Sequence, residues 1–438
     1  MERIYQVLPR LWGRGKFACW DAPALDYLRS LGITAVWFTG VPRHATGASY
    51  VKGDPGSPYA VEDWFDVNPY LADEPAKRLD EFRSLVERVH AAGLKVITDL
   101  IPNHVAPSCR QVPTHDWFDY DWSDTRKIDY SRPETLPALV QIVDFWAGLG
   151  VDGMRCDMVE LVPPEALKEL IGRVRGRHPS FLFIGECYEP ANYGRFCGEL
   201  GFDLLYDKSG YYDLVRSILC NGASARSLTW NWQRLGVLQG RMLNFLENHD
   251  EQRFASSAYA DVPEKAFAAL AFGALFNGAS FLLYAGGEIG ERAQEATDGR
   301  TSIFNWTHPE SLCKLDAFIH GKDVLNAKEK ALLERYRSIL TLSADPLFSK
   351  GGCHDLCYCN GPAAGFDPER HFAFLRFNAD SAVLVLCNFS PEPCCAQIYI
   401  PEGLLPQKEN GGQLSPSAVI TARAEAWDAA IIRLRDLR

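Results

Sequence analysis

Carboxylate side chains follow short apolar runs at four places in the first 250 residues. The four places centre on Asp99, Asp157, Glu186 and Asp250. One acidic residue in such a position is explained equally well by a helix cap or an ion pair. Four of them in the same kind of position favour a shared site, so the chemistry of paired carboxylates has to be considered.

Two carboxyl groups can cleave a glycosidic bond with retention when one attacks the sugar and the other protonates the departing oxygen. Arg155 and Asp157 are two residues apart and therefore lie on the same face of a strand. The guanidinium can hold that carboxylate ionised, as a nucleophile requires. Glu186 follows the apolar run Phe181–Ile184. Burial there would raise its pKa, as a general acid requires.

The elements that carry these residues alternate between short apolar runs and amphipathic helical stretches, which is typical of βα units with a parallel sheet. The predicted strands span residues 4–8, 35–38, 95–100, 153–156, 181–185, 202–206, 242–246 and 281–284. Gly93 and Gly150 follow two of the helical stretches, where glycine commonly ends a helix. Eight such strands predict an α/β fold of the (β/α)8 TIM-barrel type, in which the acidic residues meet at the carboxyl ends of the strands.

The chain is expected to divide into three parts. A catalytic barrel is predicted from residues 1–104 and 136–345, interrupted by a short inserted loop domain at residues 105–135. Loops of this length after a barrel strand are usually functional. From residue 346 to residue 438, short alternating strands separated by Pro, Gly and Asn predict a C-terminal antiparallel β-sandwich.

Composition narrows the class of protein. The net charge of −11 argues against nucleic acid or an anionic membrane as a partner. No run reaches the roughly 18 apolar residues of a membrane span, and the first residues lack the layout of a signal peptide. The 13 cysteines are odd in number and scattered. A reducing, cytoplasmic location is therefore expected, with the alternative of secretion if a leader was removed.

Taken together, the acidic segments resemble the signature segments of the α-amylase family, glycoside hydrolase family 13. They occur in the family's order as Asp99–His104, Gly153–Glu160, Ile184–Glu186 and Phe245–Asp250. Ile128-Asp129-Tyr130 loosely matches a weaker fifth segment inside the insertion. The resemblance extends over the whole barrel, and the predicted C-terminal β domain agrees with it in position and type.

The resemblance implies a role for each matching residue. Asp157 would be the nucleophile, Glu186 the general acid/base, and Asp250 the third carboxylate, which stabilises the transition state by binding sugar hydroxyls. The same ring would be contacted by His104 and His249, Asp157 would be oriented by Arg155, and the sugar would stack on Tyr59.

Two features depart from the family pattern. Many α-amylases follow the nucleophile with a Lys-His pair that contacts sugars on the leaving-group side, and here those positions hold Val159 and Glu160. The insertion is also shorter than in many secreted members. Asn103 matches a calcium-ligand position, and further oxygens could come from Asp116, Asp119, Asp121 and Asp124. An ordinary acidic surface loop explains these residues equally, so no cofactor is required and calcium stays an open alternative.

The expected function is a retaining α-glycoside hydrolase that acts on α-1,4-glucans or malto-oligosaccharides through a glycosyl-Asp157 intermediate. One alternative uses the same carboxylates for transglycosylation, or for α-glucosidase or isomerase action on short oligosaccharides. A second alternative is a non-catalytic sugar-binding barrel, which would be expected to have lost a carboxylate. The expected partner is then an oligo- or polysaccharide substrate, and neither a nucleic acid nor a membrane is expected as a partner. Linkage, chain length and oligomeric state are left open.

Overall fold

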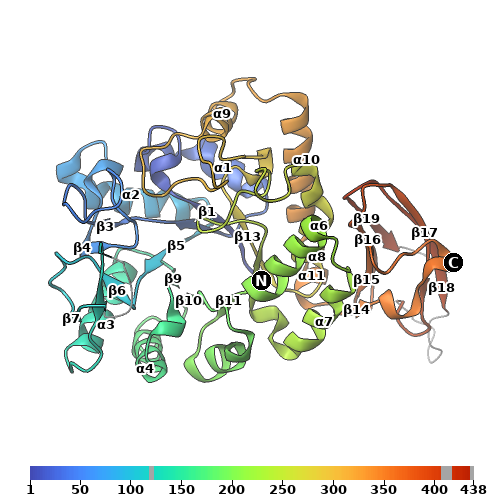
Figure 1. The fold of residues 1–438 in the computed structure, drawn as a ribbon, viewed down its shortest axis with the longest axis horizontal. Helices are drawn as coiled ribbons and strands as arrows, with labels where there is room; N and C mark the ends of the chain where they lie inside the picture. Colours follow the sequence, from blue (N-terminus) through green and yellow to red (C-terminus); the bar gives the residue numbers. More distant parts are fainter. Residues whose placement is uncertain (118–122, 406–416, 435–438) are drawn as a thin grey trace.

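The computed structural model describes residues 1–117, 123–405 and 417–434. Eight parallel strands close into a barrel, with the order β1-β13-β12-β11-β10-β9-β5-β2 (Figure 1). The prediction of a (β/α)8 barrel is confirmed. The strands are β1 (Arg3–Val7), β2 (Ala35–Phe38), β5 (Lys95–Leu100), β9 (Gly153–Cys156), β10 (Leu182–Gly185), β11 (Leu204–Tyr206), β12 (Met242–Phe245) and β13 (Ser280–Tyr284).

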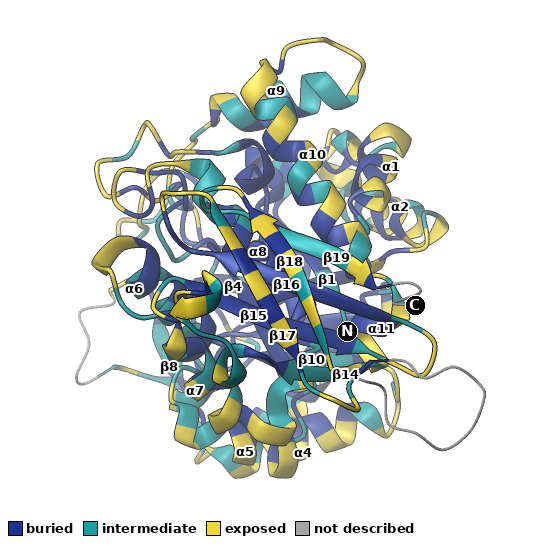
Figure 2. Cartoon of the chain, turned by 90° about the vertical axis from the view of Figure 1, so that its right-hand side faces the viewer, coloured by how far each residue is buried: buried dark blue, intermediate teal, exposed yellow. Residues whose placement is uncertain are grey.

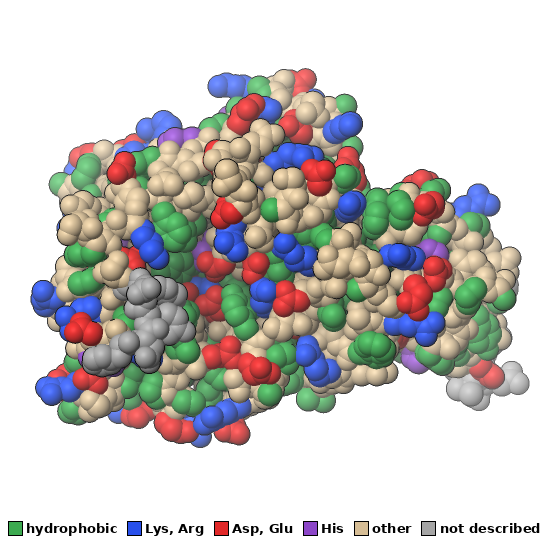
Figure 3. All heavy atoms as spheres, in the orientation of Figure 1, with side chains coloured by type: hydrophobic (Ala, Val, Ile, Leu, Met, Phe, Trp, Pro, Cys, Tyr) green, Lys and Arg blue, Asp and Glu red, His purple; other side chains and the backbone are tan. Residues whose placement is uncertain are grey.

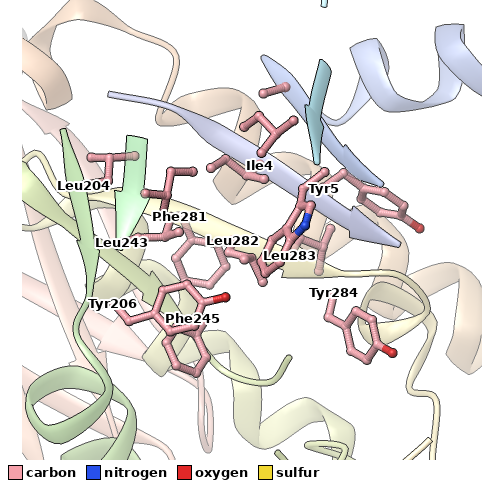
Figure 4. Packing of buried hydrophobic residues seen from close by; sticks show 14 of the residues in the cluster. Ile4, Tyr5, Leu204, Tyr206, Leu243, Phe245, Phe281, Leu282, Leu283 and Tyr284 are labelled. Atoms are coloured by element: carbon pink, nitrogen blue, oxygen red, sulfur yellow. The ribbon is translucent and has the colours of Figure 1, made fainter. Parts of the chain in front are cut away.

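The barrel strands are apolar along most of their length because both of their faces are buried. All five residues of β13 are buried, and Ile4 of β1 pairs with Leu282 of β13 on one side and with Ala35 of β2 on the other. Figure 4 shows side chains of β1, β11, β12 and β13 packed against one another. Such runs are expected where helices cover the outside of a parallel sheet.

Helices follow the strands along the chain. Gly93 and Gly150 have φ values of +75° and +93°, so each ends its helix in the left-handed conformation that glycine tolerates. The helices are α1 (Ala22–Ser30), α2 (Arg78–Ala91), α3 (Thr135–Gly148), α4 (Pro164–Arg175), α5 (Tyr193–Arg195), α6 (Asp213–Asn221), α7 (Arg226–Leu235), α8 (Ala266–Leu275), α9 (Glu310–Ile319), α10 (Ala327–Leu342) and α11 (Pro346–Lys350).

The loops after β2 and β5 contain short strands that the sequence did not predict. A hairpin of β3 (Pro42–His44) and β4 (Val61–Val67) follows β2. Between β5 and α3, β6 (His104–Val105), β7 (Thr114–His115) and β8 (Arg126–Ile128) form a small antiparallel sheet. Except for β4, which has seven residues, these strands have two or three residues and are too short to show the alternation by which strands are recognised.

The C-terminal segment forms two antiparallel sheets. One has the order β14 (Gly352–Asp355), β15 (His371–Phe377), β16 (Ala382–Asn388) and β19 (Ala429–Leu434), and the other pairs β17 (Cys394–Ile400) with β18 (Ala418–Ala424). Buried and exposed residues alternate along β17 and β18 (Figure 2). One face of the four-stranded sheet shares an apolar cluster with the buried residues of β17 and β18. Its other face belongs to the apolar cluster of the barrel, and α8, buried all round, contacts both β16 and the barrel.

Two further observations concern membrane segments and disulfides. Within the part of the chain that the structure describes, no helix has the length and apolarity that crossing a membrane requires. The 13 cysteines all lie in that part, and every one of them is free.

Candidate active site

The acidic residues singled out in the sequence meet at the carboxyl ends of the barrel strands. Asp157 directly follows β9, Glu186 directly follows β10, and Asp250 lies shortly after β12. All three line one cavity of about 480 Å³. In Figure 3 a hollow near the middle of the visible face is bordered by acidic side chains. A barrel enzyme carries its catalytic groups at this end.

Arg155 lies at the centre of this cluster. Its side chain is fully buried, and Nη1 donates a hydrogen bond to Oδ1 of Asp157. Nη2 lies 2.7 Å from Oε1 of Glu186 and 3.8 Å from Oδ2 of Asp250. Three carboxylates from three strand ends therefore converge on one guanidinium, which compensates the cost of burying its charge.

Aromatic rings complete the surroundings of Arg155. The guanidinium carbon lies 5.4 to 5.6 Å from the ring centroids of Trp37, Tyr59 and Tyr206. Contacts of this kind stabilise a cation that has been removed from water. The carboxylates and rings together hold the pKa of Arg155 above its usual range despite its burial.

Glu186 is buried and accepts hydrogen bonds at both carboxylate oxygens. The backbone N–H of Met158 donates to Oε2 at 2.7 Å, and the Tyr188 hydroxyl donates to Oε1 at 2.8 Å. Burial raises the pKa of Glu186, and Arg155 opposes that rise. The sequence placed Arg155 beside Asp157 alone, whereas the structure places it beside both carboxylates. Burial is therefore what favours a neutral Glu186.

Asp250 and His249 lie in direct contact at the site. His249 Nε2 lies 3.0 Å from Oδ2 of Asp250, and Gln6 Nε2 donates to Nδ1 of His249 at 2.6 Å. Burial and the charge of Arg155 keep the pKa of His249 well below its usual value, so the ring is neutral. Because Nδ1 accepts from an amide, the single proton of the ring is on Nε2, where the Tyr59 hydroxyl and Asp250 are the neighbouring oxygens. Removal from bulk water and the charge of Glu186 raise the pKa of Asp250.

Tyr59 and His104 also line the cavity, as do the carboxylates. The ring of Tyr59 stacks on His249, with centroids 5.2 Å apart and planes 13° apart, and its hydroxyl hydrogen-bonds with the same imidazole. Burial lowers the pKa of His104 to about 4, so this ring is neutral near pH 7. All seven residues assigned to catalysis or sugar binding therefore surround one cavity or lie directly beneath it.

The candidate calcium ligand Asn103 is buried, and its Oδ1 atom has no hydrogen-bond partner among the described residues. One oxygen is far from the six to eight that calcium takes. Asp116 is ion-paired with Arg126 at 3.4 Å. Within residues 1–117, 123–405 and 417–434, no group of three or more His, Cys, Asp or Glu side chains is arranged to hold a metal ion. Two of the acidic residues that the sequence analysis considered, Asp119 and Asp121, lie outside the described residues.

The sequence analysis missed several residues at this site. Gln6 is a polar residue between the apolar residues Tyr5 and Val7 of β1, which is the signal that could have identified it. Tyr188 lies two residues after Glu186 and therefore on the same side of an extended segment. Lys52 and Phe304 come from loops after β2 and β13 and also line the cavity. Nothing in the local sequence pattern predicts that these two loops meet.

Comparisons with known proteins agree with this geometry. The family model described as "Alpha amylase, catalytic domain" matches residues 22–120. The chain is 30% identical over 428 residues to the α-amylase MalA of Haloarcula japonica, covering 89% of this chain and 55% of that protein. It is 27% identical to neopullulanase 2 of Thermoactinomyces vulgaris, covering 86% of this chain and 63% of that protein. The chain thus spans between half and two thirds of the length of these relatives.

Solved structures resemble the whole chain in fold. A maltogenic α-amylase, AmyB, from Thermotoga neapolitana superposes with a TM-score of 0.70 and 22% identity, covering 99% of this chain and 96% of that one. An α-amylase from Geobacillus thermoleovorans, solved in complex with acarbose, superposes with a TM-score of 0.74 and 20% identity, covering 100% and 99%. At these identities the likeness shows a shared architecture.

Proposed function

We propose that this chain is a member of the α-amylase family, which its matches support, and that it is a retaining α-glycoside hydrolase. Its substrates would be the α-glucosidic bonds of α-1,4-glucans or malto-oligosaccharides. The observation that carries this proposal is the convergence of Asp157, Glu186 and Asp250 on Arg155 within one cavity. A retaining mechanism needs two carboxyl groups, one ionised and one protonated, at the same bond.

In the first step Asp157 attacks the anomeric carbon and the glycosidic bond breaks. The hydrogen bond from Arg155 orients this carboxylate. Glu186 gives its proton to the departing oxygen, so a glycosyl ester with Asp157 forms and a free sugar hydroxyl leaves. Burial of Glu186 favours the protonated form that this step needs.

In the second step Glu186, now ionised, takes a proton from water. The oxygen of that water attacks the anomeric carbon, and the ester bond to Asp157 breaks. The donors at Glu186, namely Met158 N–H and the Tyr188 hydroxyl, stabilise the carboxylate between the two steps. One residue thus serves as acid and then as base.

The remaining residues would bind the reacting sugar. Asp250 would accept hydrogen bonds from ring hydroxyls as the sugar flattens, and the neutral His249 would donate through Nε2. His104 would contact the same ring from the opposite loop. Tyr59 would supply an aromatic face. Support for this comes from the position of these residues on the wall or floor of the cavity.

The first test replaces the two reacting carboxylates. Asp157→Asn is expected to abolish turnover of malto-oligosaccharides, and Glu186→Gln to reduce it by at least a hundredfold, which is the lower range for general acid–base catalysis. Glu169→Gln, a charge change on the exposed face of α4, serves as a matched control. Wild-type rates in either site variant would contradict the assignment.

A product analysis separates hydrolysis from the alternative reactions. Wild-type protein is incubated with α-1,4-, α-1,6- and α-1,1-linked glucosides, and the anomeric configuration of the first product is followed by NMR. An α-configured product is expected from a retaining enzyme. Products longer than the substrate would instead indicate transglycosylation, and an inverted product would contradict double displacement.

A further inference from the structure

Tyr188 makes the one side-chain hydroxyl contact to Glu186 among the described residues. Its hydroxyl donates to Oε1 at 2.8 Å, beside the Nη2 atom of Arg155 at 2.7 Å from the same oxygen. A hydrogen bond to an ionised carboxylate favours the charged form over the protonated form. The Tyr188 hydroxyl therefore favours the ionised form of Glu186, whereas burial favours the protonated form.

Glu160 fixes the segment that carries Tyr188. Its carboxylate accepts from the backbone N–H of Tyr188 at 2.8 Å, from the backbone N–H of Glu189 at 3.2 Å, and from Nδ2 of Asn192 at 2.7 Å. Glu160 lies in the short helix Val159–Leu161, just after β9, whereas Tyr188 follows β10. One carboxylate thus ties together the loops that carry the two proposed reacting groups.

Tyr188 is held from a third side as well. The hydroxyl of Ser209 donates to the backbone oxygen of Tyr188 at 2.6 Å, and Nζ of Lys208 lies 5.8 Å from the centroid of the Tyr188 ring. Both polar groups of the Tyr188 backbone are therefore occupied by neighbouring elements. A side chain fixed in this way presents its hydroxyl at a constant position.

We propose that Tyr188 is a positioning residue, held in place by Glu160, which hydrogen-bonds the acid/base carboxylate and sets the pH range in which the protein works. This inference rests on the proposed role of Glu186. In the retaining cycle that carboxyl must be protonated before the first step and ionised before the second. The ionised form of Glu186 is favoured by the Met158 N–H, by Arg155 and by the Tyr188 hydroxyl. A substitution can remove the Tyr188 hydroxyl and leave both the backbone N–H and the buried charge of Arg155 in place.

The test is the pH dependence of kcat/KM for an aryl α-glucoside, measured in the wild type and in Tyr188→Phe. Removing the donor destabilises the carboxylate, so Glu186 keeps its proton to higher pH. The basic limb of the profile is expected to move upward by about one pH unit, because one pKa unit corresponds to about 1.4 kcal/mol, close to the contribution of one hydrogen bond to a charged group. Glu160→Gln, which loosens the hold on Tyr188, is expected to shift the limb in the same direction by less.

Glu165→Gln is the matched control, because it removes one charge from a side chain that is 79% exposed and far from any contact with Glu186. An unchanged or lowered basic limb in Tyr188→Phe would overturn the inference. A second measurement does not depend on turnover. The titration of Glu186 is followed by ¹³C NMR of protein labelled at the glutamate carboxyl carbons, and the Glu186 signal is identified by its loss in Glu186→Gln. If the wild type cleaved no α-glucoside, the proposed function would fail, while this titration would still test the contact.

Discussion

At the residue scale, the site depends on one buried guanidinium. Arg155 lies on β9 in register with Ile184 of β10, so its side chain can reach both Asp157, two residues onward, and Glu186 at the end of the neighbouring strand. Spacing along one strand predicts the first contact. The second depends on the pairing of strands, which the local sequence does not contain. An arginine suits this position because its planar fork presents several donors at once.

Replacing Arg155 with lysine tests this shared role. A lysine ammonium carries a single charge centre and cannot reproduce the contacts to Asp157, Glu186 and Asp250 together. We expect kcat/KM for malto-oligosaccharides to fall on the order of a hundredfold or more, the scale seen when one preorganised donor is removed from a transition state. Circular dichroism of the variant checks that the barrel is retained. A folded variant with activity near that of the wild type would contradict the role.

At the element scale, two loops far apart in the sequence meet over the cavity. Gly53, in the loop after β2, has φ of +63°, and a Cβ atom there would lie 1.8 Å from the backbone oxygen of Phe304. Beside it, Nζ of Lys52 lies 5.6 Å from the centroid of the Phe304 ring and 3.9 Å from Oδ1 of Asp124. This wall of the cavity therefore requires a residue without a side chain at position 53.

Gly53→Ala is expected to separate these loops, because the methyl group meets backbone rather than a flexible side chain. We expect KM for malto-oligosaccharides to rise several-fold. Gly47→Ala is a matched control on the same loop: its φ is +71°, but nothing lies within 4 Å of the added Cβ. The control carries a similar backbone cost of about 1–2 kcal/mol and no clash. Equal KM values in the two variants would show that the contact with Phe304 is irrelevant.

How well a strand or loop could be predicted from the sequence depended on its length and on the periodicity of its apolar residues. The barrel strands were predicted because short, largely apolar runs give a strong signal, as in Ala35–Phe38. The strand β18 gives a weaker signal, because Thr421 and Arg423 interrupt its apolar residues and several of its residues are exposed. The acidic residues at the strand ends could be identified from the local sequence. The positions of Gln6, Lys52 and Phe304 could not, because they follow from how distant segments pack.

At the scale of the whole molecule, the C-terminal sheets and the barrel share an interface that includes α8. Arg376 of β15 is buried there and donates to the backbone oxygens of Phe276, Leu347 and Gly351. A buried arginine that satisfies orphan carbonyls from several elements ties those elements together. We expect that the two parts unfold together rather than one after the other.

Buried acids make the stability of the whole molecule dependent on pH. Burial raises the pKa of Glu247 to about 7, against about 4.3 in an unfolded chain. The folded state therefore keeps a proton that the unfolded state releases, so this stabilising contribution is present below about pH 4 and is lost as the pH rises towards 7. Glu247→Gln removes the titration.

Urea denaturation at a series of pH values measures this effect. Between pH 4.5 and pH 8, the free energy of unfolding of the wild type is expected to fall by about 3 kcal/mol relative to that of Glu247→Gln. Parallel curves for the two proteins would show that Glu247 does not titrate in this range.

The closure of the barrel by β1 and β13 also bears on how the chain folds during synthesis. Arg3 is paired with Phe281, so one edge of β1 stays open until about 280 further residues have left the ribosome. At about 5–20 residues per second this takes about 15–60 s. Contacts so distant in sequence form late and slowly, and an unpaired strand edge invites pairing with other chains. The nascent chain should therefore depend on chaperones until its eighth strand emerges.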